Sequence, residues 1–250
     1  MHSKLTEHEI EILAGYRFAC NAESSAFSFH AADLLSGERL HGTLLAIQER
    51  LRAPDLKVTA SILMKRYSFY VVINLFAMSV LNKSINGAIE NISFHDNGKP
   101  GFIPDIEYSD ISADSIGCNR LKARAEICRQ TFAGHLYPII DMLSKETKLS
   151  KLILWENIAI YIFWLYETQL EQYMDLEVTE RIESDFQYLV YEAPGSIFGN
   201  LHANPLHRYY SEKVLLPERE KPARIRQTCC LSYKAGAKKM CGGCPRFSRK

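Results

Sequence analysis

Four of the seven cysteines in this 250-residue chain lie within one segment of sixteen residues. They form two pairs, Cys229-Cys230 and Cys241-x-x-Cys244, with ten residues between the pairs. A group of thiolates with glycines between them is typical of a zinc or an iron–sulfur site. A chain of this length buries a core without metal staples. We therefore expect the cysteines to have a chemical function beyond holding a small domain together.

The spacing favours iron–sulfur over zinc but leaves zinc open. A structural zinc site usually takes two C-x-x-C knuckles, and this segment has one. Neighbouring side chains point to opposite faces of an extended backbone, so Cys229 and Cys230 would need a strained turn to bind one ion. A dinuclear [2Fe-2S] cluster tolerates such a pair more easily, although neither common ferredoxin spacing is present. A redox dithiol or free cysteines are further alternatives.

The rest of the sequence predicts a cytoplasmic protein. No apolar stretch of signal-peptide type follows the first residues, and no segment reaches the roughly 20 clean apolar residues of a membrane span, so we expect no stable membrane insertion. Clustered cysteines in the cytoplasm more often bind metals than form disulfides. The other three cysteines, Cys20, Cys118 and Cys128, stand among apolar neighbours and are expected to be free thiols.

The net charge of +1 conceals a strong asymmetry along the chain. Residues 219–250 contain ten Lys or Arg and one acid, Glu220, whereas the residues before them contain 20 basic and 28 acidic side chains. A basic tail therefore follows an acidic body. Either the tail attracts the body of its own chain, or it recruits an anionic ligand or an acidic partner protein to the cysteines.

Hydrophobic spacing predicts a mainly helical body. A capping box at Thr6 and Glu9 opens the first helix. Further helices are expected over 41–52, 59–83, 119–131, 132–145, 151–173 and 178–192, and the apolar segment 59–83 should lie in the core. Gly134 and Pro138 should break or kink the helix over 132–145, and Ser150 should cap the helix that follows.

The sequence predicts β-structure in one region. Asn97-Gly98 stands between two apolar runs, which predicts a hairpin over 88–106, and the Asp-rich stretch after it is a candidate third strand. The fold class is therefore α+β: predominantly helical, with a small antiparallel hairpin or sheet and a C-terminal cysteine-loop subdomain. We place the body at 1–215 and the basic subdomain at 216–250.

The residues around the cysteines resemble the C-terminal signature of the FhuF-type siderophore ferric reductases. That family ends in a C-C-x10-C-x2-C motif that holds a [2Fe-2S] cluster. The residues carrying the resemblance are Arg226, Cys229, Cys230, Leu231, Tyr233, Cys241, Cys244 and Pro245. Upstream the match is looser: Lys65-Arg66-Tyr67 and Leu154-Trp155-Glu156-Asn157 are similar to the family's body, where glycine is more common at the position of Glu156.

The resemblance implies an enzyme that reduces Fe(III) to Fe(II) in an imported ferric siderophore of hydroxamate or carboxylate type. The cluster would be ligated by Cys229, Cys230, Cys241 and Cys244 and would receive electrons from a reduced ferredoxin-like protein or a flavin. Nothing but an electron need pass, which agrees with the absence of G-x-S-x-G and nucleotide-binding glycine motifs. From charge and position, the candidate substrate-binding residues are Lys65, Arg66, Trp155, His202, Arg224 and Arg226.

Basic residues near the sulfurs should raise the reduction potential of a cluster by stabilising its reduced state. The candidates are Arg224, Arg226, Lys234, Lys238 and Lys239. Two alternative functions remain. One is a zinc-stabilised, non-enzymatic binding module, and the other is an iron–sulfur redox sensor, for which no output module is visible. Nucleic acid is not expected as a partner, because only Tyr233 and Phe247 are interleaved with the basic charges of the tail.

Overall fold

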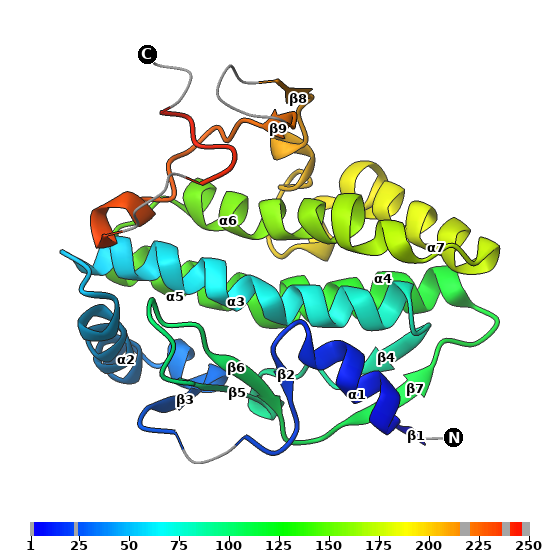
Figure 1. The fold of residues 1–250 in the computed structure, drawn as a ribbon, viewed down its shortest axis with the longest axis horizontal. Helices are drawn as coiled ribbons and strands as arrows, with labels where there is room; N and C mark the ends of the chain where they lie inside the picture. The colour runs from blue at the N-terminus through cyan, green and yellow to red at the C-terminus, as the bar shows by residue number, and fades with distance from the viewer. Residues whose placement is uncertain (1–2, 23–24, 216–220, 237–240, 247–250) are drawn as a thin grey trace.

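The computed structural model describes residues 3–22, 25–215, 221–236 and 241–246. Its long helices form the middle of the molecule, with α3 (Leu56–Ser79) at the centre and α6 (Lys151–Trp164) beside it (Figure 1). Small β-sheets lie on one side of these helices, and the C-terminal segments that contain the cysteines lie on the other (Figure 1). This arrangement confirms the predicted α+β class.

The remaining helices surround α3. They are α1 (Glu7–Ala14), α2 (Gly37–Leu51), α4 (Arg120–Arg129), α5 (Tyr137–Thr147) and α7 (Leu176–Gln187). The expected helices are thus confirmed, with shifted ends. The predicted capping box is present, with Thr6 Oγ1 accepting from the backbone N–H of Glu9. Asp55 caps α3 by accepting from the Val58 N–H at 2.9 Å, and Ser150 caps α6 in the same way.

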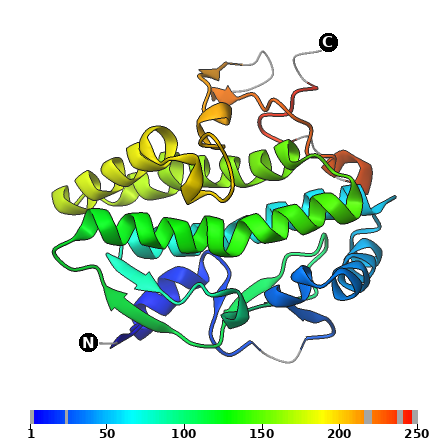
Figure 2. The same cartoon turned by 180° about the vertical axis from the view of Figure 1, so that it is seen from behind.

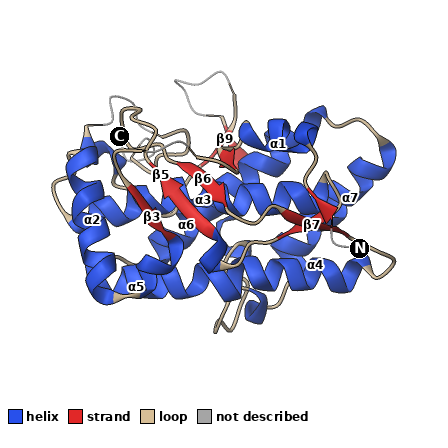
Figure 3. Cartoon of the chain, turned by 90° about the horizontal axis from the view of Figure 1, so that it is seen from below, coloured by secondary structure: helices blue, strands red, loops and turns tan. Residues whose placement is uncertain are grey.

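In the part of the chain that the structure describes, three small sheets complete the fold. The first has the order β1-β7-β4 and the second β2-β6-β5-β3, and the third pairs β8 (Lys213–Val214) with β9 (Ala223–Arg224). Every pairing is antiparallel except that of β2 with β6. The first two sheets lie next to each other under the helices (Figure 3). Their strands are β1 (Ser3–Lys4), β2 (Phe18–Ala19), β3 (Ser28–His30), β4 (Lys83–Ile85), β5 (Ile92–His95), β6 (Asp105–Tyr108) and β7 (Ser112–Ser115).

The predicted hairpin is confirmed. β5 pairs with β6 from Ile92 opposite Tyr108 to His95 opposite Asp105. Gly98 has φ +72° in the connection, a left-handed conformation that favours glycine. The Asp-rich stretch does contain a strand, β7, but β7 pairs with β1 and β4 in the other sheet instead of extending the hairpin.

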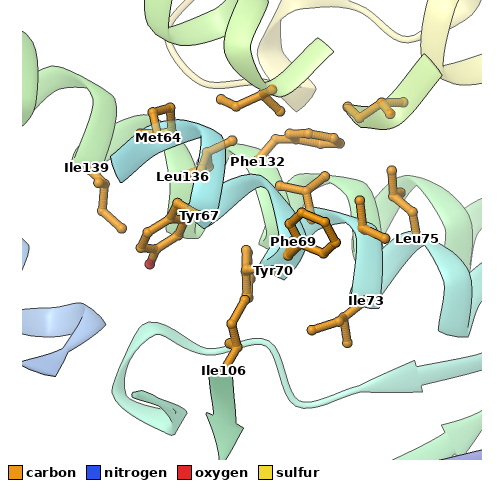
Figure 4. Packing of buried hydrophobic residues seen from close by; sticks show 14 of the residues in the cluster. Met64, Tyr67, Phe69, Tyr70, Ile73, Leu75, Ile106, Phe132, Leu136 and Ile139 are labelled. Atoms are coloured by element: carbon orange, nitrogen blue, oxygen red, sulfur yellow. The ribbon is translucent and has the colours of Figure 1, made fainter. Parts of the chain in front are cut away.

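α3 is buried along almost its whole length. Between Val58 and Ser79, every residue is buried except Lys65 and Arg66. Its aromatic and aliphatic side chains fill the space between α6, α5 and the second sheet. In Figure 4, Tyr67 and Tyr70 of α3 point towards the side on which Ile106 of β6 lies. A helix that is apolar all round requires such a central position. Lys65 and Arg66 therefore mark the one place where the middle of α3 is open to the surface.

Several helix ends differ from the predictions. α3 ends at Ser79, not at residue 83, because the chain leaves the helix to form β4. α6 ends at Trp164 and continues through a π-helical turn, Leu165–Gln169. α4 and α5 form one continuous rod, seen from behind in Figure 2. The expected break at Gly134 is a π-helical turn over Gln130–Leu136, and Pro138 lies in the first turn of α5, where its missing N–H is tolerated.

Within the described ranges, none of the helices combines the length and apolarity that crossing a bilayer would require. β8 (Lys213–Val214) pairs with β9 (Ala223–Arg224), so the expected boundary at residues 215 and 216 falls between two paired strands. The division into a body and a C-terminal subdomain stays a prediction.

Candidate metal centre

The cysteine loop, which we define as residues 226–236 and 241–246, lies against the N-terminal halves of α3 and α6. Ser61 Oγ on α3 donates a hydrogen bond to the Cys230 carbonyl at 2.8 Å. The Arg226 N–H donates to the Gly243 carbonyl at 2.8 Å, which connects the two ends of the loop. The loop is thus held both to the body and to itself through backbone groups beside the cysteines.

Gly243 is required by this close approach. A Cβ atom built on it would lie 2.0 Å from the Arg224 carbonyl oxygen and 3.5 Å from the Arg226 nitrogen. No other residue type fits between Cys241 and Cys244 at this position without moving the backbone. The second cysteine pair therefore lies directly against the segment that leads into the first.

A buried carboxylate anchors the start of the loop. Glu156 Oε1 accepts from the Gln227 N–H at 2.5 Å, and Oε2 accepts from the Thr228 N–H at 2.8 Å and from the Thr228 hydroxyl. Glu156 is 1 % exposed. A buried carboxylate is stable only when its oxygens are satisfied in this way. Glu156 thus replaces water for two backbone donors of the loop.

Arg226 completes the anchor. Its Nη2 donates to Asn157 Oδ1 at 2.6 Å, and its Nε lies 3.5 Å from Glu156 Oε2. Asn157 in turn donates to the Ser61 carbonyl at 2.9 Å. The network therefore joins α3, α6 and the cysteine loop through buried polar groups. Removing one member would leave the others desolvated and unpaired.

The sulfur atoms lie at different depths. Cys230 and Cys244 are 4 % and 5 % exposed, whereas Cys229 and Cys241 are half-buried. Cys230 Sγ lies 3.9 Å from Cys241 Sγ and 3.9 Å from Lys65 Nζ. Lys65 also donates to Ser232 Oγ at 3.3 Å. The loop therefore brings one sulfur of each cysteine pair together, next to an ammonium group on α3.

The neighbours of Cys230 stabilise its thiolate. The hydrogen bond between the two sulfurs, Cys230 and Cys241, makes the largest contribution to lowering the pKa of Cys230. Burial opposes this shift, and the Lys65 ammonium and Ser232 add to the lowering. The pKa of Cys241 is raised, first by the same hydrogen bond. Cysteine ligates a metal in its deprotonated form, so metal binding at this pair would release protons.

The donor set fits a thiolate-ligated metal. Two sulfurs bound tetrahedrally to one metal at about 2.3 Å stand about 3.8 Å apart, and the sulfurs of Cys230 and Cys241 are 3.9 Å apart. Within the described ranges, no three Cys, His, Asp or Glu side chains are grouped so that they could hold a single ion. The structure thus shows one sulfur pair at ligand spacing, with Cys229 and Cys244 in the same loop.

Two cavities meet at Cys241. The larger has a volume of about 780 Å³, and its lining includes Arg50, Arg52, Lys65, Arg66, Ser232 and Cys241. The smaller has a volume of about 460 Å³, and its lining includes Lys65, Tyr161, Trp164, Arg224, Cys241 and Gly243. Both volumes lie within the roughly 300–1,000 Å³ of small-molecule sites. Cys241 and Lys65 therefore separate a basic cavity from one with aromatic walls.

The six candidate substrate-binding residues fall into three groups. Lys65 and Arg66 line the larger cavity. Arg224 and Arg226 border the smaller one, but both guanidinium groups are engaged: Arg224 donates two hydrogen bonds of 2.9 Å to Glu167, and Arg226 belongs to the buried anchor. Trp155 and His202 line a third cavity of about 420 Å³ whose lining includes none of the cysteines.

The basic residues expected near the sulfurs are placed differently. Lys234 is exposed, and Lys238 and Lys239 lie outside the described residues. Among the described residues, the ammonium beside Cys230 Sγ comes from Lys65, which was expected to face the substrate. Arg50 and Arg52 were missed because nothing local distinguishes them from other surface arginines. Glu156 and Asn157 had a signal: they are polar residues inside the apolar run of α6.

Comparisons with known protein families agree with this geometry. A model of the family described as "Ferric iron reductase FhuF-like transporter" matches residues 61–214. A second, described as "FhuF 2Fe-2S C-terminal domain", matches residues 226–246, which include the four clustered cysteines and support a [2Fe-2S] cluster as the cofactor. No curated protein matches the chain. The first match alone spans more than half of the sequence, and the chain belongs to the FhuF-like ferric iron reductase family.

Proposed function

We propose that this protein reduces Fe(III) to Fe(II) in a ferric siderophore and so releases the iron. The cofactor is held by the thiolates of Cys229, Cys230, Cys241 and Cys244. A [2Fe-2S] cluster bound there supplies the chelate with one electron at a time. Iron changes from the 3+ to the 2+ state, and its hard oxygen ligands hold the larger, less charged ion more weakly.

The observation that carries this proposal is the position of Cys241. Its side chain lines the 780 Å³ cavity together with Lys65 and Arg66. A chelate in that cavity would lie against a residue of the cysteine loop, with no protein layer between them. An electron needs only this proximity, and no general base or nucleophile is required.

We assign the loop anchor a structural part in the reaction. Glu156, Asn157 and Arg226 hold the loop on α3 and α6, which keeps the cysteines beside the cavity. In this proposal Arg226 positions the loop and does not touch the substrate, and Arg224 does the same through Glu167. Lys65 and Arg66 stay as candidate substrate contacts, joined by Arg50 and Arg52. Trp155 and His202, which line the third cavity, are not among the proposed substrate contacts.

The proposed setting is the cytoplasm, where a reduced ferredoxin-like protein or a reduced flavin would restore the electron. The body over 1–215 would hold the chelate and the subdomain over 216–250 the cofactor. Neither nucleic acid nor stable insertion in a membrane has a part in this proposal.

The test begins with protein purified anaerobically. We expect a brown protein with visible charge-transfer bands and a rhombic EPR signal after reduction by dithionite. Mixing the reduced protein, freed of dithionite, with a ferric hydroxamate or carboxylate chelate should yield Fe(II), trapped by a ferrous-specific chelator. Cys244→Ser should lose the colour and the reduction, and Cys128→Ser, which changes a buried thiol of the body, should keep both.

Two results would contradict the proposal. Colourless protein with stoichiometric zinc would indicate the zinc-stabilised binding module instead. Reduction of the chelate that survives Cys244→Ser would show that the cofactor of this loop does not carry the electron.

A further inference from the structure

The larger cavity is unusually basic for a small-molecule site. Four of its lining residues, Arg50, Arg52, Lys65 and Arg66, are cationic, and none of the described lining residues is acidic. They come from two places: the end of α2 with the turn after it, and the open stretch in the middle of α3. Two separate segments thus direct positive charge at one space.

The described residues compensate only part of this charge. Arg50 pairs with Asp96 at 3.0 Å, and Lys65 Nζ lies 3.9 Å from Cys230 Sγ. Arg66 donates from Nη2 to the Gly101 carbonyl, a neutral partner, and its buried Nε has no hydrogen-bond partner among the described residues. Arg52 is exposed at the end of α2. Arg52 and Arg66 therefore offer positive charge to a ligand.

A fifth cation, Arg17, lies close enough to Arg66 to interact with its charge. The pKa of Arg17 is lowered to about 10, mainly by burial and then by the charge of Arg66. Arg17 Nη1 is also buried without a hydrogen-bond partner among the described residues. The charge of Asp105 acts on Arg17 in the opposite sense but less strongly than that of Arg66, so the repulsion between the two guanidinium groups is only partly offset. An anionic ligand would relieve that repulsion.

We propose that this cavity selects ferric chelates with a net negative charge, namely complexes with carboxylate or α-hydroxycarboxylate groups, over neutral trihydroxamate complexes. The inference rests on the proposed function and narrows its substrate class. Reduction adds one electron to the complex and makes its charge more negative by one. The same cations therefore bind the Fe(II) form before release more strongly than the Fe(III) form, which favours electron transfer in a basic cavity.

Binding can be tested apart from electron transfer, because Ga(III) has the charge of Fe(III) but is not reduced. Two probes suffice: the Ga(III) complex of a citrate-based dihydroxamate, which has one net negative charge, and that of a neutral trihydroxamate. Equilibrium dialysis of both against the full-length holoprotein gives their dissociation constants. The matched variants are Arg52→Gln and Arg66→Gln in the cavity, with Arg39→Gln as the control. Arg39 lies on α2, is 72 % exposed and pairs with Asp33.

We expect the anionic complex to bind at least about tenfold tighter than the neutral one at low salt. Arg52→Gln and Arg66→Gln should each reduce this preference by about threefold to fivefold. Arg39→Gln should leave the preference unchanged, and none of the three substitutions should alter the visible spectrum of the holoprotein. Raising the ionic strength should weaken binding of the anionic complex alone.

Equal binding of the two Ga(III) complexes by the unmodified protein would overturn the inference. So would a loss of preference in Arg39→Gln as large as that in Arg52→Gln and Arg66→Gln. Failure of the inference is distinct from failure of the proposed function. If both ferric complexes are reduced and the two Ga(III) complexes bind equally, the proposed reductase function is supported and the charge selectivity is contradicted. If the protein prefers the anionic Ga(III) complex but reduces neither ferric complex, the charge selectivity is supported and the proposed reductase function is contradicted.

Discussion

Replacing Gly243 with alanine tests the position of the cysteine loop directly. The added methyl group would lie 2.0 Å from the Arg224 carbonyl oxygen, where such contacts in proteins are at least 3.0 Å. The backbone must therefore separate by at least about 1 Å at this point, which a close-packed site does not absorb freely. Arg224 is poorly placed to move, because Glu167 and the β8-β9 pairing hold it.

The expected cost follows from two contributions. Separation breaks the hydrogen bond from the Arg226 N–H to the Gly243 carbonyl, worth about 1 kcal/mol. Overpacking adds about 1–3 kcal/mol. Together they weaken docking of the loop by roughly thirtyfold to a thousandfold. The core of the body does not include Gly243, so its unfolding temperature should change little.

The assay is loss of the cofactor to a competing iron chelator. After anaerobic reconstitution, iron and acid-labile sulfide per chain are measured, and the decay of the visible bands is followed with chelator present. Gly243→Ala should lose its colour much faster than the unmodified protein or should fail to load. Gly117→Ala is the matched control, because a methyl group there meets no atom within 4 Å. Normal loading and normal chelator resistance in Gly243→Ala would refute the described approach of Gly243 to Arg224.

Three further predictions concern the anchor and the core. Glu156→Gln keeps one acceptor but turns an NH₂ group towards a backbone donor of Gln227 or Thr228, so chelators should remove the cofactor faster; an unchanged rate would contradict the anchor. Asp185→Asn leaves Arg120 without its buried carboxylate and should lower the free energy of unfolding in urea by about 3–5 kcal/mol, with normal iron content in the folded protein; a change below 1 kcal/mol would argue against the ion pair. His135, whose pKa burial lowers to about 3, takes up a proton more easily when unfolded. The free energy of unfolding should therefore fall as the pH falls between about 6.5 and 3, by at most about 1.4 kcal/mol per pH unit. If urea titrations of His135→Asn give the same dependence of this free energy on pH, His135 is not its cause.

Local signals account for what could be predicted from the sequence. The capping box at Thr6, the cap at Ser150 and the Asn97-Gly98 turn each specify structure within a few residues, and each is confirmed. The cysteine segment is identifiable for the same reason, since its spacing lies within sixteen residues. Lys65-Arg66 also has a local signal, because the pair interrupts an apolar helix where the cavity opens.

Contacts between distant segments could not be predicted. Arg226 stands three residues before Cys229 and was expected to face the substrate, but its partners, Glu156 and Asn157, lie about seventy residues away in the chain. β7 follows the hairpin directly and yet pairs with β1 from the N-terminal end of the fold. Val80 and Leu81 continue the apolar pattern of α3, and only the pairing of β4 with β7 shows why the helix ends before them.

The position of the anchor has a consequence for how the protein is made in a cell short of iron. Ser61, Glu156 and Asn157 all precede the cysteines in the chain, so the ribosome completes the docking surface before it synthesises the loop. The apolar core contains none of the four clustered cysteines. We therefore expect the body to fold without iron, so that the folded apoprotein accumulates when iron is scarce and receives its cofactor last.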